Sequence, residues 1–585
     1  MPPRWLPLLL ALVILVPGIG AIDLWAPDEP RYAQVAEEVR SLEHGPSGVL
    51  LLHLGGEVYT QKPPLYYWLA ALLGAPGGHV SEWAARGPSV LAGLGCVLAV
   101  QSFGARLFSL PGVGAWAALV LISLLRFAHQ ARRAQLDVLL TLFECVALMA
   151  GWAILQAHDA SPRRPWRWLL VLHGGVGLAM LTKGPVGALP YLVLLVFLVW
   201  EGRLREVRRL FPAWGIGLAL SPSLAWLASA VALAPAAGFF ADAVVDNVLA
   251  RFFSGTAHVR PFYYYARQLP LDLLPWTPLV VLAAVSAWRR QRGSTESDEG
   301  DRSALRLLLA WGLTFVVFFS LSSGKRGLYM LPAFPAAALL SGWLLARALE
   351  DQRLPRGLES CGIAFVAIAG TGGALITFGF PLPTPTPPLH VFGSMLTLIA
   401  ALYVPIALWQ RRRCADPAVR GTGLIVSLAA VELAIFIGLF PALNAQKSPR
   451  ALAQAVTQLT SNHERVGVFR HSALIGGIVY YSGRRAVPLE SQGDLLRFVA
   501  GGDRIVVARA HRADEVARVV RGEVRAAVRH GRRQLMVIQA GIDESTRSTI
   551  EETVDPASGP PGVGTMETEA TFPDFPDFPD SPSPP

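Results

Sequence analysis

Unbroken apolar runs constrain this sequence more than any other feature. They recur along most of the chain, and many are about 20 residues long, the length at which a helix spans the roughly 30 Å hydrocarbon core of a bilayer. Hydrophobic residues make up 52% of the chain and charged residues only 16%, against about 25% charged residues in an average soluble domain. The pattern excludes an ordinary soluble enzyme and predicts an α-helical polytopic membrane protein.

These runs predict about thirteen spans, which together form a transmembrane domain at 1–441. The expected spans are 5–22, 84–104, 112–127, 138–157, 168–182, 185–200, 212–234, 273–288, 305–322, 328–346, 359–379, 390–410 and 422–440. The run 65–76 is short for a crossing, so a re-entrant or interfacial helix is expected there.

The positions of lysine and arginine predict how the spans are oriented. With the N-terminus in the cytoplasm, the inner loops hold 20 of these residues, and the outer loops up to the last span hold 12. Cytoplasmic loops are enriched in positive residues, so the loops 23–64 and 235–272 and the C-terminal region are expected outside. The net charge of +9 arises from these clusters and does not indicate nucleic-acid binding.

The sequence changes character after the last span. Helix-like stretches (451–460, 473–481, 491–499, 513–529) alternate with short β-rich runs (465–469, 486–489, 504–508, 533–538). Such alternation predicts a small α/β domain at 447–541. Residues 542–585 are rich in Pro and Asp and have little to bury, so a disordered tail is expected.

The first outer loop opens with LWAPDEPRYAQVAEEVR, which predicts a helix near Asp28 followed by an apolar stripe of Tyr32, Val35, Ala36 and Val39. Such a helix is expected to lie on the membrane surface with this stripe facing down. Asp28 and Glu29 then stand at its positive N-terminal end. A carboxylate there stays ionised and can bind a metal, orient a cation or accept a proton. The simpler alternative is that Asp28 only caps the helix.

The same loop ends with YTQKPPLYYWL, which presents Lys62 on a stiffened chain. Pro63 and Pro64 fix φ behind the lysine, and the aromatic residues suit a bilayer interface. A rigid cation at the level of the headgroups is well placed to bind a lipid phosphate. The alternative is a lysine that only anchors the chain at the interface.

Two further motifs place an acid and a lysine at the predicted outer ends of spans. Asp137 begins one span, and a lone acid in that position is costly unless it is paired or functional. Lys183 stands in the tight turn TKGPVGALP, either as a phosphate contact or as an interface anchor.

Two more outer motifs add cations and a phenol. Arg260 lies in RFFSGTAHVRPFYYY, and SGKRGLYMLPAFPA places Lys325 one helical turn from Tyr329. Basic residues together with a tyrosine hydroxyl suit a phosphate. Acids and cations gathered on one face therefore describe a cavity for an anionic amphiphile such as a lipid phosphate.

The motifs PDEPRYAQVAEE, QKPPLYYWL, TKGPVGALP, RFFSGTAHVRPFYYY and SGKRGLYMLPAFPA, in this order, resemble those of the bacterial polyprenyl-phosphate sugar transferases. The likeness is strongest to the lipid A aminoarabinose transferases and more distant to the protein O-mannosyltransferases. It covers roughly residues 5–350. The resemblance implies a GT-C transmembrane bundle with an external active site and an undecaprenyl-phosphate-linked sugar donor.

The resemblance also implies roles for individual residues. Asp28 and Asp137 match the catalytic acids of the family, and the matched or neighbouring substrate-binding residues are Glu29, Lys62, Arg260, Lys325 and Tyr329. Gln61 departs from the pattern, because the aminoarabinose transferases tend to have Glu before the motif lysine. In that branch this Glu can share a metal with the loop histidine, here His258. No metal ligand is therefore assigned, although a divalent cation remains open as a cofactor.

These observations predict a multi-pass glycosyltransferase of the bacterial inner membrane. It is expected to move a sugar from a polyprenyl-phosphate donor to lipid A or a related envelope glycan at the periplasmic face. A protein acceptor is the alternative within the enzyme class. The alternative from another class is a transporter of lipid-linked sugars, which is expected to show inverted repeats and charged residues at mid-membrane. Neither feature is apparent in the sequence.

Overall fold

The computed structural model describes most of the chain. The described residues are 2–157, 166–234, 238–250, 259–292, 299–355, 357–378, 387–413, 416–461, 464–531 and 533–541. The predicted tail at 542–585 lies outside them, and so does His258 of the predicted loop 235–272.

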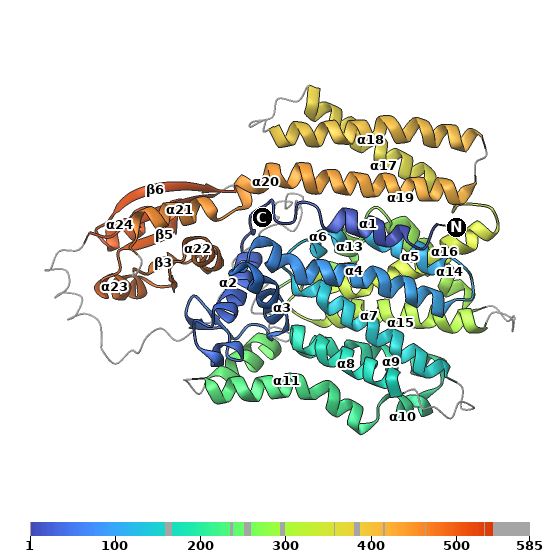
Figure 1. Ribbon diagram of the computed structural model, residues 1–585, viewed down its shortest axis with the longest axis horizontal. Helices are drawn as coiled ribbons and strands as arrows, with labels where there is room; N and C mark the ends of the chain where they lie inside the picture. Colours follow the sequence, from blue (N-terminus) through green and yellow to red (C-terminus); the bar gives the residue numbers. More distant parts are fainter. Residues whose placement is uncertain are drawn as a thin grey trace, which may run out of the picture.

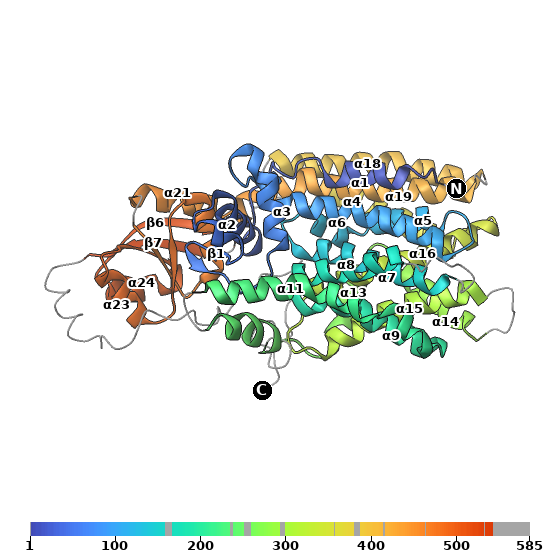
Figure 2. The same ribbon diagram turned by 60° about the horizontal axis from the view of Figure 1, so that its bottom comes forward.

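Long helices with nearly parallel axes form the body of the molecule (Figures 1 and 2). They are α4 (Glu82–Leu107), α7 (Leu136–Gln156), α8 (Trp166–Lys183), α9 (Leu189–Glu201), α11 (Ala213–Leu233), α15 (Glu299–Leu321), α16 (Phe334–Glu350), α17 (Leu358–Phe378), α18 (Pro387–Arg412) and α19 (Pro417–Ala434). Among the described residues, nine helices or continuous helical runs are long and apolar enough to cross a membrane, or up to eleven if two bent pairs each count as one span. The predicted polytopic α-helical class is confirmed.

The run Trp166–Glu201 is a single unit in that count, but the contacts at its ends show a hairpin of α8 and α9. Lys183, at the end of α8, lies 2.5 Å from Asp137 at the start of α7. Arg203, just after α9, donates to the Leu155 carbonyl near the end of α7. Helices α8 and α9 therefore run in opposite directions along α7, as the separate predicted spans 168–182 and 185–200 require.

One predicted span is bent: in the run 112–127, α5 (Val113–Ile122) and α6 (Leu125–Ala131) meet at 71°. A second bend of 114° lies between α14 (Thr277–Arg290), in the predicted span 273–288, and α13 (Tyr264–Asp272), in the predicted loop before it. Ser123 explains the first bend, because its hydroxyl donates to the Leu119 carbonyl at 2.7 Å and accepts from Trp276 Nε1 at 2.9 Å. A serine that binds helix carbonyls in this way competes with the helical backbone.

The first predicted span, 5–22, is wrong in its length. Helix α1 covers only Leu6–Leu15, which is 10 residues. Pro17 cannot donate a backbone hydrogen bond to continue the helix, and Gly18 has a φ of +73°. The chain therefore leaves the helix early and runs toward α2.

Helices α2 (Asp28–Ser41) and α3 (Leu65–Gly74) occupy the end of the bundle that carries the C-terminal domain. The predicted stripe on α2 is buried. However, it packs on protein rather than on a membrane surface, since the ring of Tyr32 lies 5.7 Å from that of Tyr67 on α3. The start of α2 also differs from the prediction that Asp28 caps the helix: Asp28 is the first helical residue, and its side chain makes no cap hydrogen bond.

The C-terminal residues form the predicted α/β domain, built on a five-stranded sheet of order β4-β3-β5-β7-β6. Its elements are α21 (Arg450–Leu459), β3 (Val466–Phe469), α22 (Ile475–Ser482), β4 (Ala486–Leu489), α23 (Gln492–Ala500), β5 (Ile505–Arg509), α24 (Ala510–Val519), β6 (Glu523–His530) and β7 (Arg533–Gln539). β3 is parallel to β4 and β5, whereas β7 is antiparallel to β5 and β6. Helix α20 (Phe440–Lys447) joins the domain to the bundle.

The predicted helix 513–529 is wrong in its second half. Helix α24 ends at Val519, and β6 pairs with β7 from Glu523 to His530. Arg521 has a φ of +47°, which a continuing α-helix does not allow. Val524, Ala526 and Val528 then alternate with polar or small residues, which is the period of a strand.

The orientation of the bundle gives the first testable prediction. The motif-bearing end and the C-terminal domain should lie outside the cytoplasm, because the opposite loops carry the larger share of lysine and arginine. Alkaline phosphatase fused after residue 445 should be active, and the same fusion after residue 353 should be inactive. A fluorescent reporter that folds only in the cytoplasm should give the opposite result at both sites. An active phosphatase at 353 and an inactive one at 445 would contradict this orientation.

Candidate active site

Asp28 lies at the start of α2 with its carboxylate between two guanidinium groups. Arg31, one turn further along α2, pairs with one oxygen, and Arg326 lies 3.2 Å from the other. Gln135 Nε2 also donates to Asp28, at 3.4 Å. Burial alone would raise the pKa of the Asp28 carboxyl, but Arg326 and Arg31 hold it below its ordinary value. The side chain is therefore an ionised acid engaged by cations and not a helix cap.

The two guanidinium groups are themselves held in place. Arg31 also donates to Gln61 Oε1 at 3.2 Å, which connects α2 with the segment before α3. Arg326 immediately precedes the short helix η7 (Gly327–Ala333), and the Tyr265 hydroxyl donates to its carbonyl at 3.0 Å. Neither arginine was among the predicted site residues, although the spacing of Asp28 and Arg31 by three residues was a usable signal.

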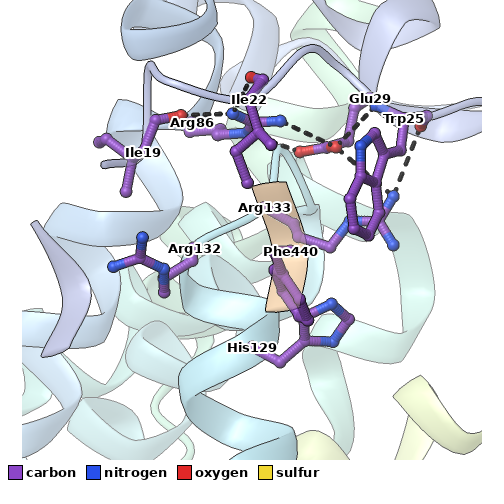
Figure 3. A pocket seen from close by; sticks show the side chains of 9 residues that line it. All are labelled: Ile19, Ile22, Trp25, Glu29, Arg86, His129, Arg132, Arg133 and Phe440. Carbon is purple, nitrogen blue, oxygen red and sulfur yellow. Dashed lines mark hydrogen bonds and ion pairs between the residues drawn. The ribbon is translucent and has the colours of Figure 1, made fainter. Parts of the chain in front are cut away.

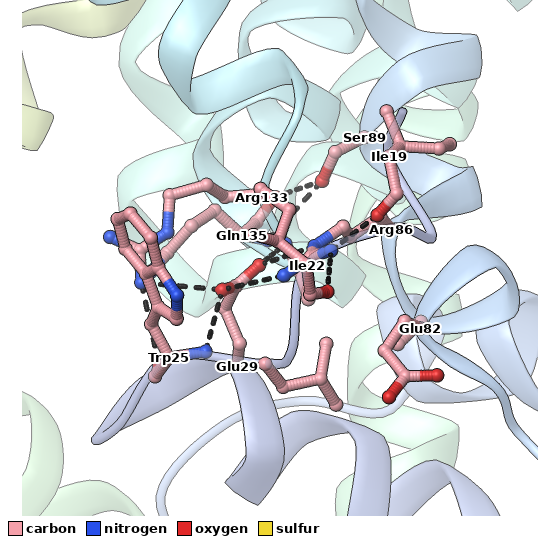
Figure 4. Close-up of polar contacts among 12 residues, drawn as sticks. Ile19, Ile22, Trp25, Glu29, Glu82, Arg86, Ser89, Arg133 and Gln135 are labelled. Atoms are coloured by element: carbon pink, nitrogen blue, oxygen red, sulfur yellow. Dashed lines mark hydrogen bonds and ion pairs between the residues drawn. The ribbon is translucent and has the colours of Figure 1, made fainter. Parts of the chain in front are cut away.

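Glu29, the residue after Asp28, takes part in a separate buried network (Figure 4). Arg86 of α4 donates to both of its carboxylate oxygens, at 2.9 and 3.1 Å. The backbone N–H groups of Trp25 and Ala134 donate to it as well, each at 2.9 Å. Burial raises the pKa of Glu29, but Arg86 and Arg133 together lower it to about 2. Glu29 thus fastens the start of α2 to two other parts of the chain, and its predicted contact with substrate stays a prediction.

A small pocket lies beside the Glu29–Arg86 pair (Figure 3). It is lined by Ile19, Ile22, Trp25, Glu29, Arg86, His129, Arg132, Arg133 and Phe440. Most of its polar groups are already used within the protein: Arg86 donates to the carbonyls of Ile19 and Ile22, and Arg132 donates to that of Ile14. The residues around this pocket therefore hold the segment between α1 and α2 in place.

Asp137, Lys183 and Tyr329 form a second polar group near Asp28. The Lys183 ammonium lies 2.5 Å from an Asp137 oxygen and 4.7 Å from the centre of the Tyr329 ring. Gln135, which reaches Asp28, stands two residues before Asp137. The structure thus brings both predicted acids to the same end of the bundle, each with a cation beside it.

The remaining predicted cations occupy different settings. Lys62 is partly buried and follows Gln61, the partner of Arg31, so its backbone lies next to the Asp28 cluster. Lys325 is 4% exposed, and its ammonium donates to the carbonyls of Arg260, at 3.0 Å, and Ser322. Lys325 therefore ties the segment before η7 to Arg260, whose own side chain is exposed. The substrate contacts predicted for these three residues stay predictions.

Gln61 does not fit a divalent cation. Its amide oxygen is neutral and accepts from the Arg31 guanidinium, whereas a hard cation prefers carboxylate or other oxygen ligands without a competing positive charge. Among the described residues, the side chains of Glu38, Glu43 and His44 come close enough to share an ion. Glu38 is already bound there by the backbone N–H of Gly55 at 2.5 Å, so this group stabilises the turn after α2.

The sequence interpretation missed two buried acids inside helical runs: Glu144 lies within α7, and Glu432 lies near the end of α19, within the continuous run Pro417–Leu459. Glu144 of α7 and Glu432 of α19 are 0% and 4% exposed. Within the described part of the chain, no hydrogen-bond partner reaches their carboxylate oxygens. Because charged residues do lie inside membrane-length helices, their supposed absence from mid-membrane is not a valid argument against a transporter.

Comparisons with known proteins address the class directly. Residues 7–241 match the family model for dolichyl-phosphate-mannose-protein mannosyltransferases. An undecaprenyl phosphate-α-4-amino-4-deoxy-L-arabinose arabinosyl transferase of Pseudomonas savastanoi pv. phaseolicola is 31% identical over 430 residues, or 72% of this chain and 76% of that protein. Arabinosyl transferase 2 of Pseudomonas fluorescens Pf-5 is 32% identical over 353 residues, and the match spans 57% of its length.

A solved structure shows the same fold. ArnT from Cupriavidus metallidurans, bound to undecaprenyl phosphate, superposes with a TM-score of 0.70 at 21% sequence identity, and the match covers 91% of this chain and 97% of that chain. The predicted GT-C bundle with a small C-terminal α/β domain is thereby confirmed. By sequence and fold together, the chain belongs to the undecaprenyl phosphate-aminoarabinose arabinosyl transferase family of membrane glycosyltransferases.

Proposed function

We propose that this protein transfers a sugar from an undecaprenyl-phosphate-linked donor to lipid A or a related envelope glycan. The reaction takes place at the periplasmic face of the inner membrane, at the end of the bundle that carries α2 and the C-terminal domain. The relatives are named for 4-amino-4-deoxy-L-arabinose, so this is the first donor sugar to test. A donor ending in undecaprenyl phosphate agrees with the lipid named for the ArnT structure.

The environment of Asp28 is the observation that most supports this proposed transfer reaction. A carboxylate held between Arg31 and Arg326 stays ionised at neutral pH and is a weak base, because a useful general base has a pKa near the working pH. Asp28 therefore orients the sugar or the acceptor and removes no proton from a hydroxyl group. A phosphate acceptor such as that of lipid A is already nucleophilic, so this arrangement favours lipid A over a protein hydroxyl.

The remaining cations act on the leaving group. In the transfer, the bond between the anomeric carbon and the lipid-phosphate oxygen breaks, and its electron pair leaves with the phosphate. The acceptor oxygen forms the new bond to the anomeric carbon. Lys62, Arg260 and Tyr329 stabilise the charge that develops on the departing phosphate, which is the usual way that fixed positive groups lower such a barrier.

The Asp28→Asn variant should lose transfer activity while the protein stays folded in the membrane. The substitution keeps the size of the side chain but removes the charge that pairs with Arg31 and Arg326, so turnover should fall by roughly 10²–10³-fold. The measurement is transfer in nanodiscs with purified donor and lipid A, alongside size-exclusion chromatography.

Glu37→Gln is the matched control for Asp28→Asn. Glu37 is also an acid on α2, and it pairs with an arginine three residues away, Arg40, but it lies more than two helical turns from Asp28. Its variant should keep near-normal turnover. If Asp28→Asn performs as well as Glu37→Gln, Asp28 has no part in the reaction.

Variants of Lys62 separate phosphate binding from interface anchoring. Lys62→Ala should weaken donor binding by about 10- to 150-fold, the equivalent of roughly 1.5–3 kcal/mol for a charge-assisted contact. Lys62→Arg should also impair binding, because the planar guanidinium replaces a compact charge beside two prolines. An anchoring lysine would tolerate arginine. Donor affinity is the measurement, with Arg518→Ala on the exposed face of α24 as the control, and unchanged affinity of Lys62→Ala would refute the phosphate contact.

A further inference from the structure

Helix α22 of the C-terminal domain packs directly against α2, the helix that begins with Asp28 (Figure 1). The two helices approach closely at Gly476, which is buried. A Cβ atom at this position would lie 2.6 Å from Arg31 Cα and 2.8 Å from Arg31 N. Real Cβ atoms do not approach backbone so closely, so the absence of a side chain at Gly476 lets the domain reach the backbone of the residue that pairs with Asp28.

A hydrogen bond fixes the segment just before α2 to the same helix. Tyr481 of α22 accepts from the backbone N–H of Leu24 at 2.7 Å and donates to Glu82 at 3.3 Å. Leu24 is 0% exposed, so its N–H has no access to water in place of the phenol. Trp25, the next residue, donates its N–H to Glu29, and this connects the Tyr481 hydroxyl to the start of α2.

Two more side chains clamp this segment. Arg450, at the start of α21, lies 2.8 Å from both Asp23 and Glu82. Asn444 of α20 accepts from the Asp23 N–H and from Trp25 Nε1, each at 3.1 Å. The chain around residues 23–31 is therefore held from one side by the bundle, through Arg86, and from the other side by the C-terminal region.

We propose that the C-terminal domain is a working part of the active site and that Tyr481 and Gly476 are positioning residues for Asp28. Tyr481 fixes the chain that leads into α2, and Gly476 sets the distance of the domain from Arg31. This inference rests on the proposed transfer reaction. In this proposal, the C-terminal domain holds the Asp28 carboxylate and the Arg31 guanidinium in the positions that the bound sugar requires.

Tyr480 provides a matched control within the same helix. Its hydroxyl donates across the same interface to the Val80 carbonyl, also at 2.7 Å, and Val80 N–H donates to Glu37. Tyr480→Phe and Tyr481→Phe therefore each remove one phenol hydroxyl from the face of α22 that contacts the bundle. Only the second removes a contact with the segment that leads into Asp28.

The test compares these two variants in full-length protein. Tyr481→Phe should lower kcat by roughly ten- to a hundredfold with little change in KM for the donor, because small displacements of a positioning group cost rate rather than binding. Tyr480→Phe should stay within about twofold of wild type. Equal kcat values for the two variants would overturn the positioning role, since they would leave Tyr481 as an ordinary interface residue.

Hydrogen exchange gives a readout that does not depend on activity. Peptides covering 23–41 should exchange faster in Tyr481→Phe than in wild type, and Tyr480→Phe should speed exchange mainly around 79–82. Unchanged exchange at 23–41 in Tyr481→Phe would overturn the inference. If wild type itself transfers no sugar from an undecaprenyl-phosphate donor, the proposed function fails, and the exchange data alone then decide whether the domain holds α2.

A second variant addresses the close approach. Gly476→Ala should lower kcat by at least tenfold, because its methyl group must displace the backbone at Arg31. Gly493→Ala on α23 is the control, since the nearest atom to its added Cβ is Ser491 Oγ at 3.6 Å. A Gly476→Ala protein with wild-type kcat and wild-type exchange at 23–41 would contradict the proposed contact.

Discussion

The buried pair of Glu29 and Arg86 is the interaction on which the rest of this end of the molecule depends. Arg86 binds Glu29 and the carbonyls of Ile19, Ile22 and Asp23, so one guanidinium gathers the whole segment that leads from α1 to α2. Glu29 in turn accepts from Ala134, before α7. A buried charge with so many partners is costly to disturb, because loss of one partner leaves the other uncompensated. The pair therefore fixes where α2 begins.

The adjacent acids Asp28 and Glu29 have different partners and, in our proposal, different roles. Both carboxylates are buried, but Glu29 is held by Arg86 and backbone N–H groups, whereas Asp28 faces Arg31 and Arg326, which come from α2 and from the segment before η7. Gln135 is held by Ser89 of α4 and completes the set around Asp28. The carboxylate of Asp28 is thus held by buried supports on several elements, so the charges in the proposed active site are already in place without a ligand, as preorganised catalysis requires.

Local patterns in the sequence were sufficient for much of this architecture. The apolar runs, the start of α2 near Asp28, the short helix at 65–76 and the four predicted strands depend on spacing within a few residues. Two of the errors had local causes, at Pro17 and at Arg521, and the others arose where residues distant in the sequence decide the structure. Ser123 bends a span with help from Trp276, and the stripe on α2 packs on Tyr67 instead of lipid. Arg326 reaches Asp28 from 298 positions away, and no local pattern contains such a pairing.

The bond between Leu24 and Tyr481 joins residues 457 positions apart. A ribosome makes the first of them before the long helices α4 to α19 and the second after them. The segment before α2 therefore has no Tyr481 to bind until the helices between the two residues have been synthesised. Contacts between residues so far apart in the sequence close the largest loops of the chain, so α2 gains its contact with the C-terminal domain only when both ends of this long segment have been made.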